Sequence, residues 1–350
     1  MAKVIAVSNA FPKYYYSQKD ISGLLAAMWP EHREVIERLA TTSGVEQRHL
    51  VQPLEAFPEM GGFGARSQVY QRESLEMLKT AITSLREKMP FEWKDVGALF
   101  STTITGVSVP SLEARMMNIF PQIPTDVTRM PLFGLGCLGG IGTLNRAADW
   151  LRLHPTKLAV VMAVEACSLT FQLKDVSMAN LIATHLFGDG SAAVLMVGDK
   201  HPLAGRSGLR VLDHKASFYP NTERVMGWEM VNNGFQIILS GNVPEMVTKN
   251  VAQDLAKFLP QPGPSLDDIR FMVSHPGGPK VLKAIEQVMG GKPLTGHSWE
   301  SLKDNGNMSS VSVLDVLRRT LEQDHKAQGL GLGVAMGPAF NAEFTLFEAT

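Results

Sequence analysis

Short apolar runs typical of buried strands alternate along this chain with longer stretches of helical periodicity. The strand-like runs read KVIAVS, DVGALFSTT, KLAVVMAVE, AAVLMVG, DIRFMVSH, LGVAMG and AEFTLFEA. Helix-like stretches lie between them at 73–89, 244–259 and 310–325. This alternation predicts an α/β protein whose sheets are covered by helices.

Two of the strand-like runs repeat one pattern about half the chain apart. Residues 95–101 read DVGALFS and residues 268–274 read DIRFMVS, so each run begins at Asp, continues with apolar residues and ends at Ser. A duplicated βαβ core leaves an echo of this kind in a sequence. We therefore expect two similar halves packed together.

Composition restricts the class of partner. The 350 residues are 45% hydrophobic and 19% charged, which favours a compact core over disorder. The formal net charge is -1 and no Lys/Arg stripe is present, so we expect no nucleic acid and no membrane as partner. Two cysteines without CxxC or HExxH spacing indicate neither a disulfide framework nor a structural metal.

The apolar stretches of the chain are short. The N-terminal run breaks at Pro12, which is too early for a signal peptide. The strongest internal run, 158–171, contains Glu165 and is far below transmembrane length. We therefore expect a cytoplasmic protein.

One cysteine lies among four glycines, in PLFGLGCLGG at 131–140. Leu144, Ala147 and Leu151 follow at helical spacing, so Cys137 precedes the start of a helix. The positive end of a helix dipole favours thiolate, the nucleophilic form of cysteine. A small buried hydrophobic residue beside a tight turn would give the same pattern, because unpaired cysteine is often buried.

A histidine and an asparagine lie in similar turns. His275 ends a strand-like run in VSHPGGP, and Asn307 lies in DNGNMSS ahead of a helix. Catalytic side chains often occupy such loops. One of nine histidines can equally be structural, and Asn307 can be a helix N-cap, although Ser309 or Ser310 could cap as well.

The three residue types together suggest one chemistry. Cysteine with histidine can form a thiolate–imidazolium pair, and histidine with asparagine can donate to a developing oxyanion. A cysteine protease also uses this set. However, the CGSCW-like sequence around its cysteine is absent here, and a duplicated α/β core does not suit that class.

The motifs GCLGG, LFGDGSAA, HPGGP, GNMSS and GPAFNAEF occur in this order across essentially the whole chain. In order and spacing they resemble the bacterial branch of the type III polyketide synthases, the chalcone and stilbene synthase family. The resemblance implies that Cys137 is the nucleophile, and His275 and Asn307 the catalytic histidine and asparagine. Phe187, in LFGDG, matches the gatekeeper phenylalanine between the coenzyme A tunnel and the inner cavity.

The resemblance also implies an architecture. The family has a thiolase-like α/β fold, with duplicated βαβ halves in a layered αβαβα arrangement, and works as a homodimer. Residues 1–210 would form the half that carries the cysteine, and residues 211–350 the half that carries the histidine and asparagine. No metal or other cofactor is implied, because coenzyme A thioesters are the substrates.

Several positions depart from the plant members of the family. Cys167 replaces a threonine, Trp228 falls where a small glycine is expected, and the GFGPG loop reads AMGPA at 335–339. Arg48 is the candidate for holding the coenzyme A phosphates. The resemblance assigns the cavity lining to Thr105, Cys167, Thr170, Ala183, Trp228 and Ser309.

The resemblance implies that an acyl-CoA starter loads onto Cys137 and is extended by decarboxylative Claisen condensation with malonyl-CoA. Cyclisation would then give a pyrone- or resorcinol-type product. A fatty acyl-CoA starter is favoured, and malonyl-primed synthesis stays open. The alternatives are a 3-oxoacyl-ACP synthase III, which typically has HQAN and GNTS where this chain has HPGGP and GNMS, and a catalytically silent thiolase-fold binding protein.

The segment TGVSVPSLEARM resembles the family's TSGVDMP stretch, in which the residue before proline reaches the partner's cavity through a cis peptide bond. Val109 takes that place in front of Pro110. An X–Pro bond needs only about 0.5–1 kcal/mol to be held in cis. The alternative is a trans proline that opens the following helix.

Overall fold

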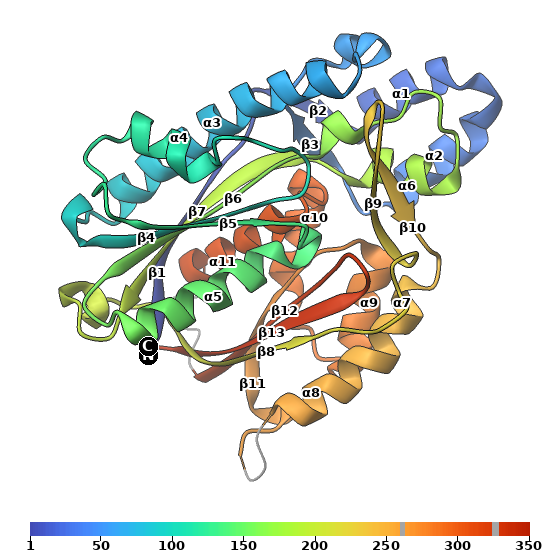
Figure 1. Ribbon diagram of the computed structural model, residues 1–350. Coiled ribbons are helices and arrows are strands. Elements are labelled where there is room, and N and C mark those ends of the chain that lie inside the picture. The colour runs from blue at the N-terminus through green and yellow to red at the C-terminus, as the bar shows by residue number, and fades with distance from the viewer. Residues whose placement is uncertain (260–262, 324–328) are drawn as a thin grey trace.

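The computed structural model describes residues 1–259, 263–323 and 329–350. In Figure 1, α5 and α11 lie between an upper set of strands, β4 to β7, and a lower set, β8 and β11 to β13. Helix α3 covers the outer side of the upper strands, and α8 and α9 lie below the lower ones. The layers therefore follow the predicted αβαβα arrangement.

The main sheet contains nine strands of the described chain in the order β11-β12-β13-β8-β1-β7-β6-β4-β5. Two further pairs, β2 with β3 and β9 with β10, stand apart from it. The strands are β1 Ala2–Ala10, β2 Tyr14–Ser17, β3 Gln47–Leu50, β4 Val96–Thr103, β5 Thr128–Phe133, β6 Leu158–Ala166, β7 Asp189–Gly198, β8 Leu209–Ser217, β9 Met226–Val231, β10 Gly234–Leu239, β11 Ile269–Ser274, β12 Gly329–Gly337 and β13 Asn341–Ala349.

The helices fill the connections between these strands. Short 3-10 turns, labelled η, precede several of them. The helices are α1 Gln18–Met28, α2 Arg33–Thr42, α3 Phe63–Lys88, α4 Leu112–Ile119, α5 Gly139–Leu153, α6 Met178–Leu186, α7 Val243–Met246, α8 Ala252–Phe258, α9 Pro279–Val288, α10 Gly296–Asn305 and α11 Ser310–Gln323.

The sheet shows the duplication that the sequence predicts. From its centre outward, β1-β7-β6-β4 and β8-β13-β12-β11 have the same pattern, with two antiparallel pairs followed by one parallel pair. The two echoed runs form β4 and β11, which occupy equivalent places. Each follows a 3-10 turn, η3 Trp93–Asp95 or η8 Leu266–Asp268. The predicted boundary between residues 210 and 211 falls inside β8, the first strand of the second set.

Some predicted helices differ in extent. The helix predicted at 73–89 is the end of a longer one, because α3 begins at Phe63. The stretch predicted at 244–259 is α7 and α8 joined by one π-helical turn, η7 Val247–Val251. The end of the helix predicted at 310–325 lies outside the described residues.

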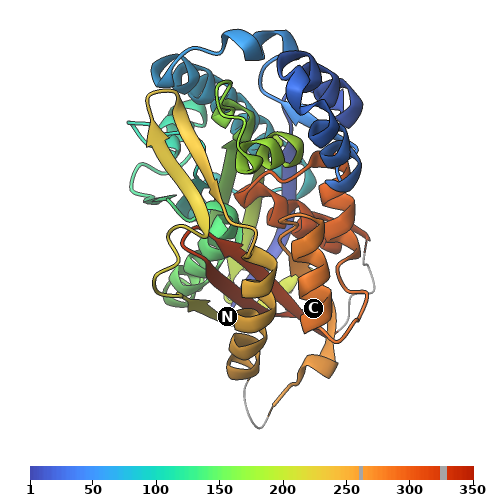
Figure 2. The same cartoon turned by 90° about the vertical axis from the view of Figure 1, so that its right-hand side faces the viewer.

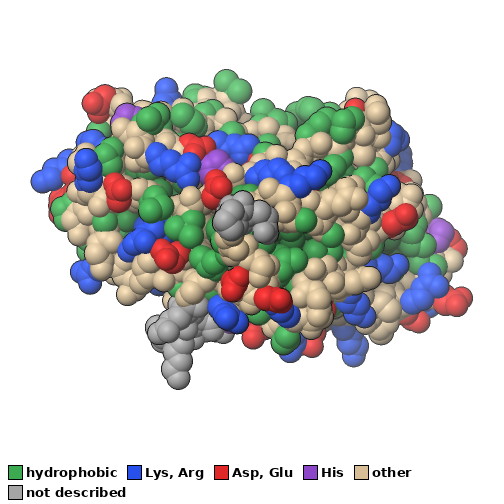
Figure 3. All heavy atoms as spheres, turned by 90° about the horizontal axis from the view of Figure 1, so that it is seen from below, with side chains coloured by type: hydrophobic (Ala, Val, Ile, Leu, Met, Phe, Trp, Pro, Cys, Tyr) green, Lys and Arg blue, Asp and Glu red, His purple; other side chains and the backbone are tan. Residues whose placement is uncertain are grey.

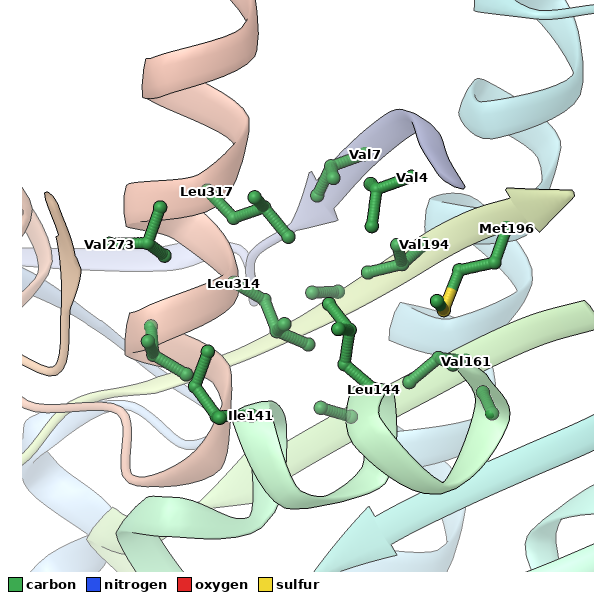
Figure 4. Close-up of a cluster of buried hydrophobic side chains, with 14 of the residues drawn as sticks. Val4, Val7, Ile141, Leu144, Val161, Val194, Met196, Val273, Leu314 and Leu317 are labelled. Atoms are coloured by element: carbon green, nitrogen blue, oxygen red, sulfur yellow. The ribbon is translucent and has the colours of Figure 1, made fainter. Parts of the chain in front are cut away.

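One large part of the core lies between the two central helices and the strands on both sides of them. Figure 4 shows side chains of α5 and α11 pointing toward those of β1, β6 and β7. Side chains of this kind each contribute about 1.5–3 kcal/mol on burial. The labelled members are Val4, Val7, Ile141, Leu144, Val161, Val194, Met196, Val273, Leu314 and Leu317.

The two termini lie near one another, in the lower half of the molecule as drawn in Figure 1 and Figure 2. On the face in Figure 3, basic and acidic side chains are interspersed. None of the helices among the described residues combines the length and the apolar character needed to cross a membrane.

The two central helices approach one another through glycine. A Cβ atom on Gly140 of α5 would lie 2.4 Å from the Ser310 carbonyl oxygen and 2.5 Å from Val313 Cγ1, both of α11. On Gly139 it would lie 2.5 Å from Thr102 Oγ1 and 3.2 Å from Ser310 Cβ. The backbone at the start of α5 is therefore pressed against the start of α11.

We expect Gly140→Ala to lower the free energy of unfolding by about 1–3 kcal/mol, because the added methyl group overpacks this contact. The matched control is Gly23→Ala in α1, where nothing lies within 4 Å of the added Cβ. There alanine should be neutral or stabilising by up to about 1 kcal/mol. Urea unfolding measures both. Equal stability of the two variants would contradict the close contact.

Candidate active site

Cys137 lies where the sequence places it, at the entry to a central helix. It belongs to the 3-10 turn η4 Gly136–Leu138, which runs directly into α5. Gly136 has φ +55°, and a Cβ there would lie 2.5 Å from Pro338 Cδ, so this turn requires glycine. The turn packs against β12 and α11.

The pKa of the Cys137 thiol is raised, although the dipole of the following helix favours the thiolate. Cys137 keeps some exposed surface, but burial of its thiol raises the pKa to about 12, and the charge of Glu165 acts in the same direction. Desolvation therefore outweighs the helix dipole. The raised pKa favours the neutral thiol over the thiolate at neutral pH.

Asn307 and Ser309 lie beside this sulfur. Both side chains lower the Cys137 pKa, so both stabilise the thiolate. The Ser309 backbone has φ +49°, and its N–H donates to Asn307 Oδ1 at 2.8 Å. That bond leaves the Asn307 Nδ2 group available as a donor. The Ser309 hydroxyl is buried and makes no hydrogen bond to a nitrogen or oxygen atom of the described residues.

His275 follows directly after β11. Its N–H donates to the Val334 carbonyl of β12 at 2.9 Å, which fixes it at the carboxyl end of this parallel pair. The turn that carries Cys137 packs against the same strand β12. Burial lowers the pKa of His275 to about 3, so the imidazole is neutral. Both of its ring nitrogens are buried without a partner in the described part of the chain.

Unpartnered buried polar atoms are rare in native proteins, and each one needs an explanation. Here His275 contributes two such atoms and Ser309 a third. A polar substrate atom bound between these groups would satisfy them. The geometry brings Cys137, Asn307 and Ser309 together and places His275 on the same edge of the sheet. Their convergence on one shared point stays a prediction.

Phe187 connects this cluster to a cavity. Its backbone forms an isolated parallel bridge with Asn307. Its ring lies 5.7 Å from the ring of Trp228, and both side chains line the cavity. Phe187 therefore contacts both Asn307 and the cavity, and its role as a gatekeeper stays a prediction.

The cavity has about 560 Å³ of empty space, part of it open to solvent, and its walls are mainly apolar. Four of the predicted lining residues belong to it: Cys167, Thr170, Ala183 and Trp228. Thr105 lies instead in a smaller, neighbouring pocket with Tyr70. The rest of the wall includes Ile21, Leu24, Leu25, Leu50, Leu54, Phe57, Phe171 and Ile237.

Sequence reasoning missed the role of Glu165 in the site. This carboxylate is fully buried and accepts from Thr105 Oγ1 at 2.7 Å, from the N–H groups of Ile104 and Thr105, and from Ser310 Oγ at 2.5 Å. Burial raises its pKa. It joins the segment after β4 to the start of α11. A single charged residue within the apolar run 158–171 was the available signal.

The structure argues against the prediction that Arg48 holds the coenzyme A phosphates. Its side chain is 1% exposed. The guanidinium donates to the Phe187 carbonyl at 2.8 Å and to Gln18 Oε1 at 2.6 Å. Both terminal nitrogens of the guanidinium are therefore already engaged within the protein. The arginine lies in the cavity wall, and its hydrogen bonds go to other residues of the protein.

We expect Ser309→Ala to slow alkylation of Cys137 by iodoacetamide at fixed pH by about tenfold. Loss of the hydroxyl removes a group that lowers the thiol pKa, so the pKa rises and the thiolate fraction falls. The rate is measured on the Cys137 peptide in a Cys167→Ala background. Ser301→Ala, which removes another buried unpartnered hydroxyl, is the control. An unchanged or faster rate in Ser309→Ala would contradict this arrangement.

The comparisons with known proteins agree with this site. Residues 21–275 match the family described as FAE1/Type III polyketide synthase-like protein, and residues 211–349 match the C-terminal domain of chalcone and stilbene synthases. The chain is 38% identical to 1,3,6,8-tetrahydroxynaphthalene synthase of Streptomyces peucetius subsp. caesius, over 99% of this chain and 92% of that protein.

Two further relatives span a similar length. Alpha-pyrone synthesis polyketide synthase-like Pks18 of Mycobacterium tuberculosis is 26% identical over 99% of this chain and 91% of its own. The crystal structure of the tetrahydroxynaphthalene synthase of Streptomyces coelicolor A3(2) superposes with a TM-score of 0.93 at 28% identity, covering 99% of both chains. This chain belongs to the type III polyketide synthases of the chalcone and stilbene synthase family, acyltransferases that act on coenzyme A thioesters.

Proposed function

We propose that this enzyme loads a fatty acyl-CoA starter onto Cys137 and extends it with malonyl-CoA to a pyrone- or resorcinol-type product. The observation that carries the starter class is the mainly apolar cavity beside Phe187. In this proposal the first half of the chain, 1–210, supplies the nucleophile. The second half, 211–350, supplies His275 and Asn307.

Loading begins from a neutral pair, because burial raises the pKa of Cys137 and lowers that of His275. As Sγ attacks the starter carbonyl, its proton passes to His275 Nε2. The C–S bond to coenzyme A breaks, coenzyme A leaves as a thiolate that takes a proton from solvent, and His275 keeps the Cys137 proton at Nε2. The product of this step is an acyl thioester on Cys137.

Extension uses the same polar groups. Malonyl-CoA loses its carboxylate as CO₂, and the electron pair of the broken C–C bond forms an enolate at the thioester oxygen. His275 Nε2–H and Asn307 Nδ2 donate to that oxygen, each typically worth about 3 kcal/mol. The enolate carbon attacks the acyl carbonyl, Cys137 leaves as thiolate, and the lengthened chain is reloaded for the next round.

A malonyl starter is the second candidate, since the relative that is 38% identical is named 1,3,6,8-tetrahydroxynaphthalene synthase. The two candidates differ in what the cavity must hold. An alkyl chain occupies apolar surface such as that of Leu24, Leu25 and Phe57. A malonyl group gains little from that surface, because its carboxylate loses hydration there and the cation in the wall, Arg48, already donates to Phe187 and Gln18.

Incubation with malonyl-CoA and a panel of starters, from acetyl-CoA to long-chain fatty acyl-CoA, tests the starter class. We expect kcat/KM to rise with chain length, by about 0.8 kcal/mol for each buried CH₂ until the cavity is full. Mass spectrometry identifies the products. Turnover of malonyl-CoA alone, unaffected by added fatty acyl-CoA, would support the malonyl-primed alternative. Absence of coenzyme A release with every starter would support a silent binding protein.

We also propose a homodimer in which Val109 reaches the partner's cavity. The Val109–Pro110 bond is cis, as expected, and the Val109 side chain is 87% exposed. Strand β5 lies at the edge of the main sheet, and Met130 and Phe133 on it are exposed. An edge strand with exposed apolar side chains favours pairing with another chain.

Two variants distinguish dimer formation from the contribution of Val109 to the wall of the partner's cavity. Met130→Asp puts a charge on the β5 edge, and we expect sedimentation as a monomer with altered products. Val109→Ala should sediment as a dimer while the distribution of product chain lengths shifts, because only the borrowed wall changes. A monomeric wild type, or a Val109→Ala dimer with unchanged products, would contradict the shared wall.

A further inference from the structure

Three consecutive carbonyl groups at the end of α6 are held by three different parts of the chain. The His185 carbonyl accepts from Gln18 Nε2 at 2.9 Å, and the Leu186 carbonyl accepts from the Asn307 N–H at 2.8 Å. The Phe187 carbonyl accepts from Arg48 Nη1 at 2.8 Å. The segment that carries the gatekeeper is therefore fixed from α1, from β3 and from the turn before α11.

Arg48 is the charged member of this set. Burial lowers its pKa to about 9, with Asp189 acting in the opposite direction, so it is a cation at neutral pH. It lies at the C-terminal end of α6, where the helix dipole favours a positive charge. The second donor of the guanidinium, Nη2, bonds Gln18 Oε1 at 2.6 Å, so Arg48 and Gln18 support neighbouring carbonyls as one unit.

The same segment positions Asn307. The Gly188 N–H donates to the Asn307 carbonyl at 3.0 Å, while Asn307 N–H donates to Leu186. The stem of Arg48 fills the space beside the two glycines: a Cβ on Gly188 would lie 3.2 Å from Arg48 Cβ, and one on Gly306 would lie 3.6 Å from Arg48 Cδ. Displacement of Arg48 would therefore disturb both of the segments that the Phe187–Asn307 backbone bridge joins.

We propose that Arg48 is a positioning residue that holds the Phe187 peptide against Asn307 and so keeps water from the acyl-enzyme. This inference rests on the proposed function and assigns to Arg48 a role at the same site. The arginine does not touch the reacting atoms. It acts through the Phe187 carbonyl, and its loss lets the gate and the Asn307 turn move relative to one another.

The first test is amide hydrogen exchange in the peptide spanning 185–189, which needs no substrate. We expect Arg48→Met to speed exchange of Gly188 by about tenfold or more, and Arg48→Lys to have a smaller effect because lysine reaches one acceptor. The matched control is Arg66→Met. Arg66 is also buried and also donates to carbonyls, those of Leu169 and Phe171. Unchanged exchange in Arg48→Met, or an equal increase in Arg66→Met, would overturn the proposal.

The second test is the partition of the acyl-enzyme between condensation and hydrolysis. This ratio does not depend on how much enzyme is folded, so a merely structural role would not change it. We expect the hydrolysed fraction to rise severalfold in Arg48→Met and to be partly restored in Arg48→Lys. If Arg48→Met does not fold, Arg48→Lys is compared with wild type in both tests, the exchange rate of Gly188 and the hydrolysed fraction of the acyl-enzyme.

The two tests separate this inference from the proposed function. A wild type that forms no acyl-enzyme on Cys137 would contradict the proposed function, while the exchange rates would still decide what Arg48 does. A wild type that forms the acyl-enzyme, with unchanged partition in both Arg48 variants, would contradict the inference alone.

Discussion

The contact between the starts of α5 and α11 is the constraint on which the site depends. One helix begins just after Cys137 and the other just after Asn307 and Ser309, so the two helices must meet at their first turns for the three side chains to converge. Gly140 allows this, because any Cβ there would run into the Ser310 carbonyl. The main core fixes the same two helices along their lengths. The central layer therefore joins Cys137, the proposed nucleophile, to Asn307 and Ser309, which come from the other end of the chain.

The polar groups around this contact are not all satisfied by the protein. Glu165 is saturated with donors and fixes the surrounding backbone, whereas the ring nitrogens of His275 and the hydroxyl of Ser309 have no nitrogen or oxygen partner among the described residues. Each unsatisfied group costs about 1–3 kcal/mol. Unsatisfied donors lower the stability of the folded protein. In return, they are already in place to stabilise an oxyanion when it forms. The raised pKa of the Cys137 thiol fits the same scheme, because in the proposed mechanism its proton moves to His275 only as the starter is attacked.

The sequence was sufficient for the fold and for placing Cys137, His275 and Asn307 next to the ends of helices or strands. The echo at 95–101 and 268–274 predicted the duplication because equivalent strands keep the same burial pattern. The role of Arg48 could not be predicted. No residue near it in the sequence indicates that its guanidinium points into the protein and donates to the Phe187 carbonyl. The significance of Glu165 was also hidden, since its donors come from segments far apart in sequence. Ala339 stands where the family has a glycine, and only the backbone shows that it adopts φ +54°.

The central claim is that Cys137 alone carries the growing chain, and intact-mass measurement after incubation with a fatty acyl-CoA tests it most directly. The account predicts one acyl adduct on wild type, one on Cys167→Ala and none on Cys137→Ala. Cys167 lines the cavity and has its thiol pKa raised well above the ordinary value by burial, so it is the stringent control. An acyl adduct that persists in Cys137→Ala, or is lost in Cys167→Ala, would contradict the account.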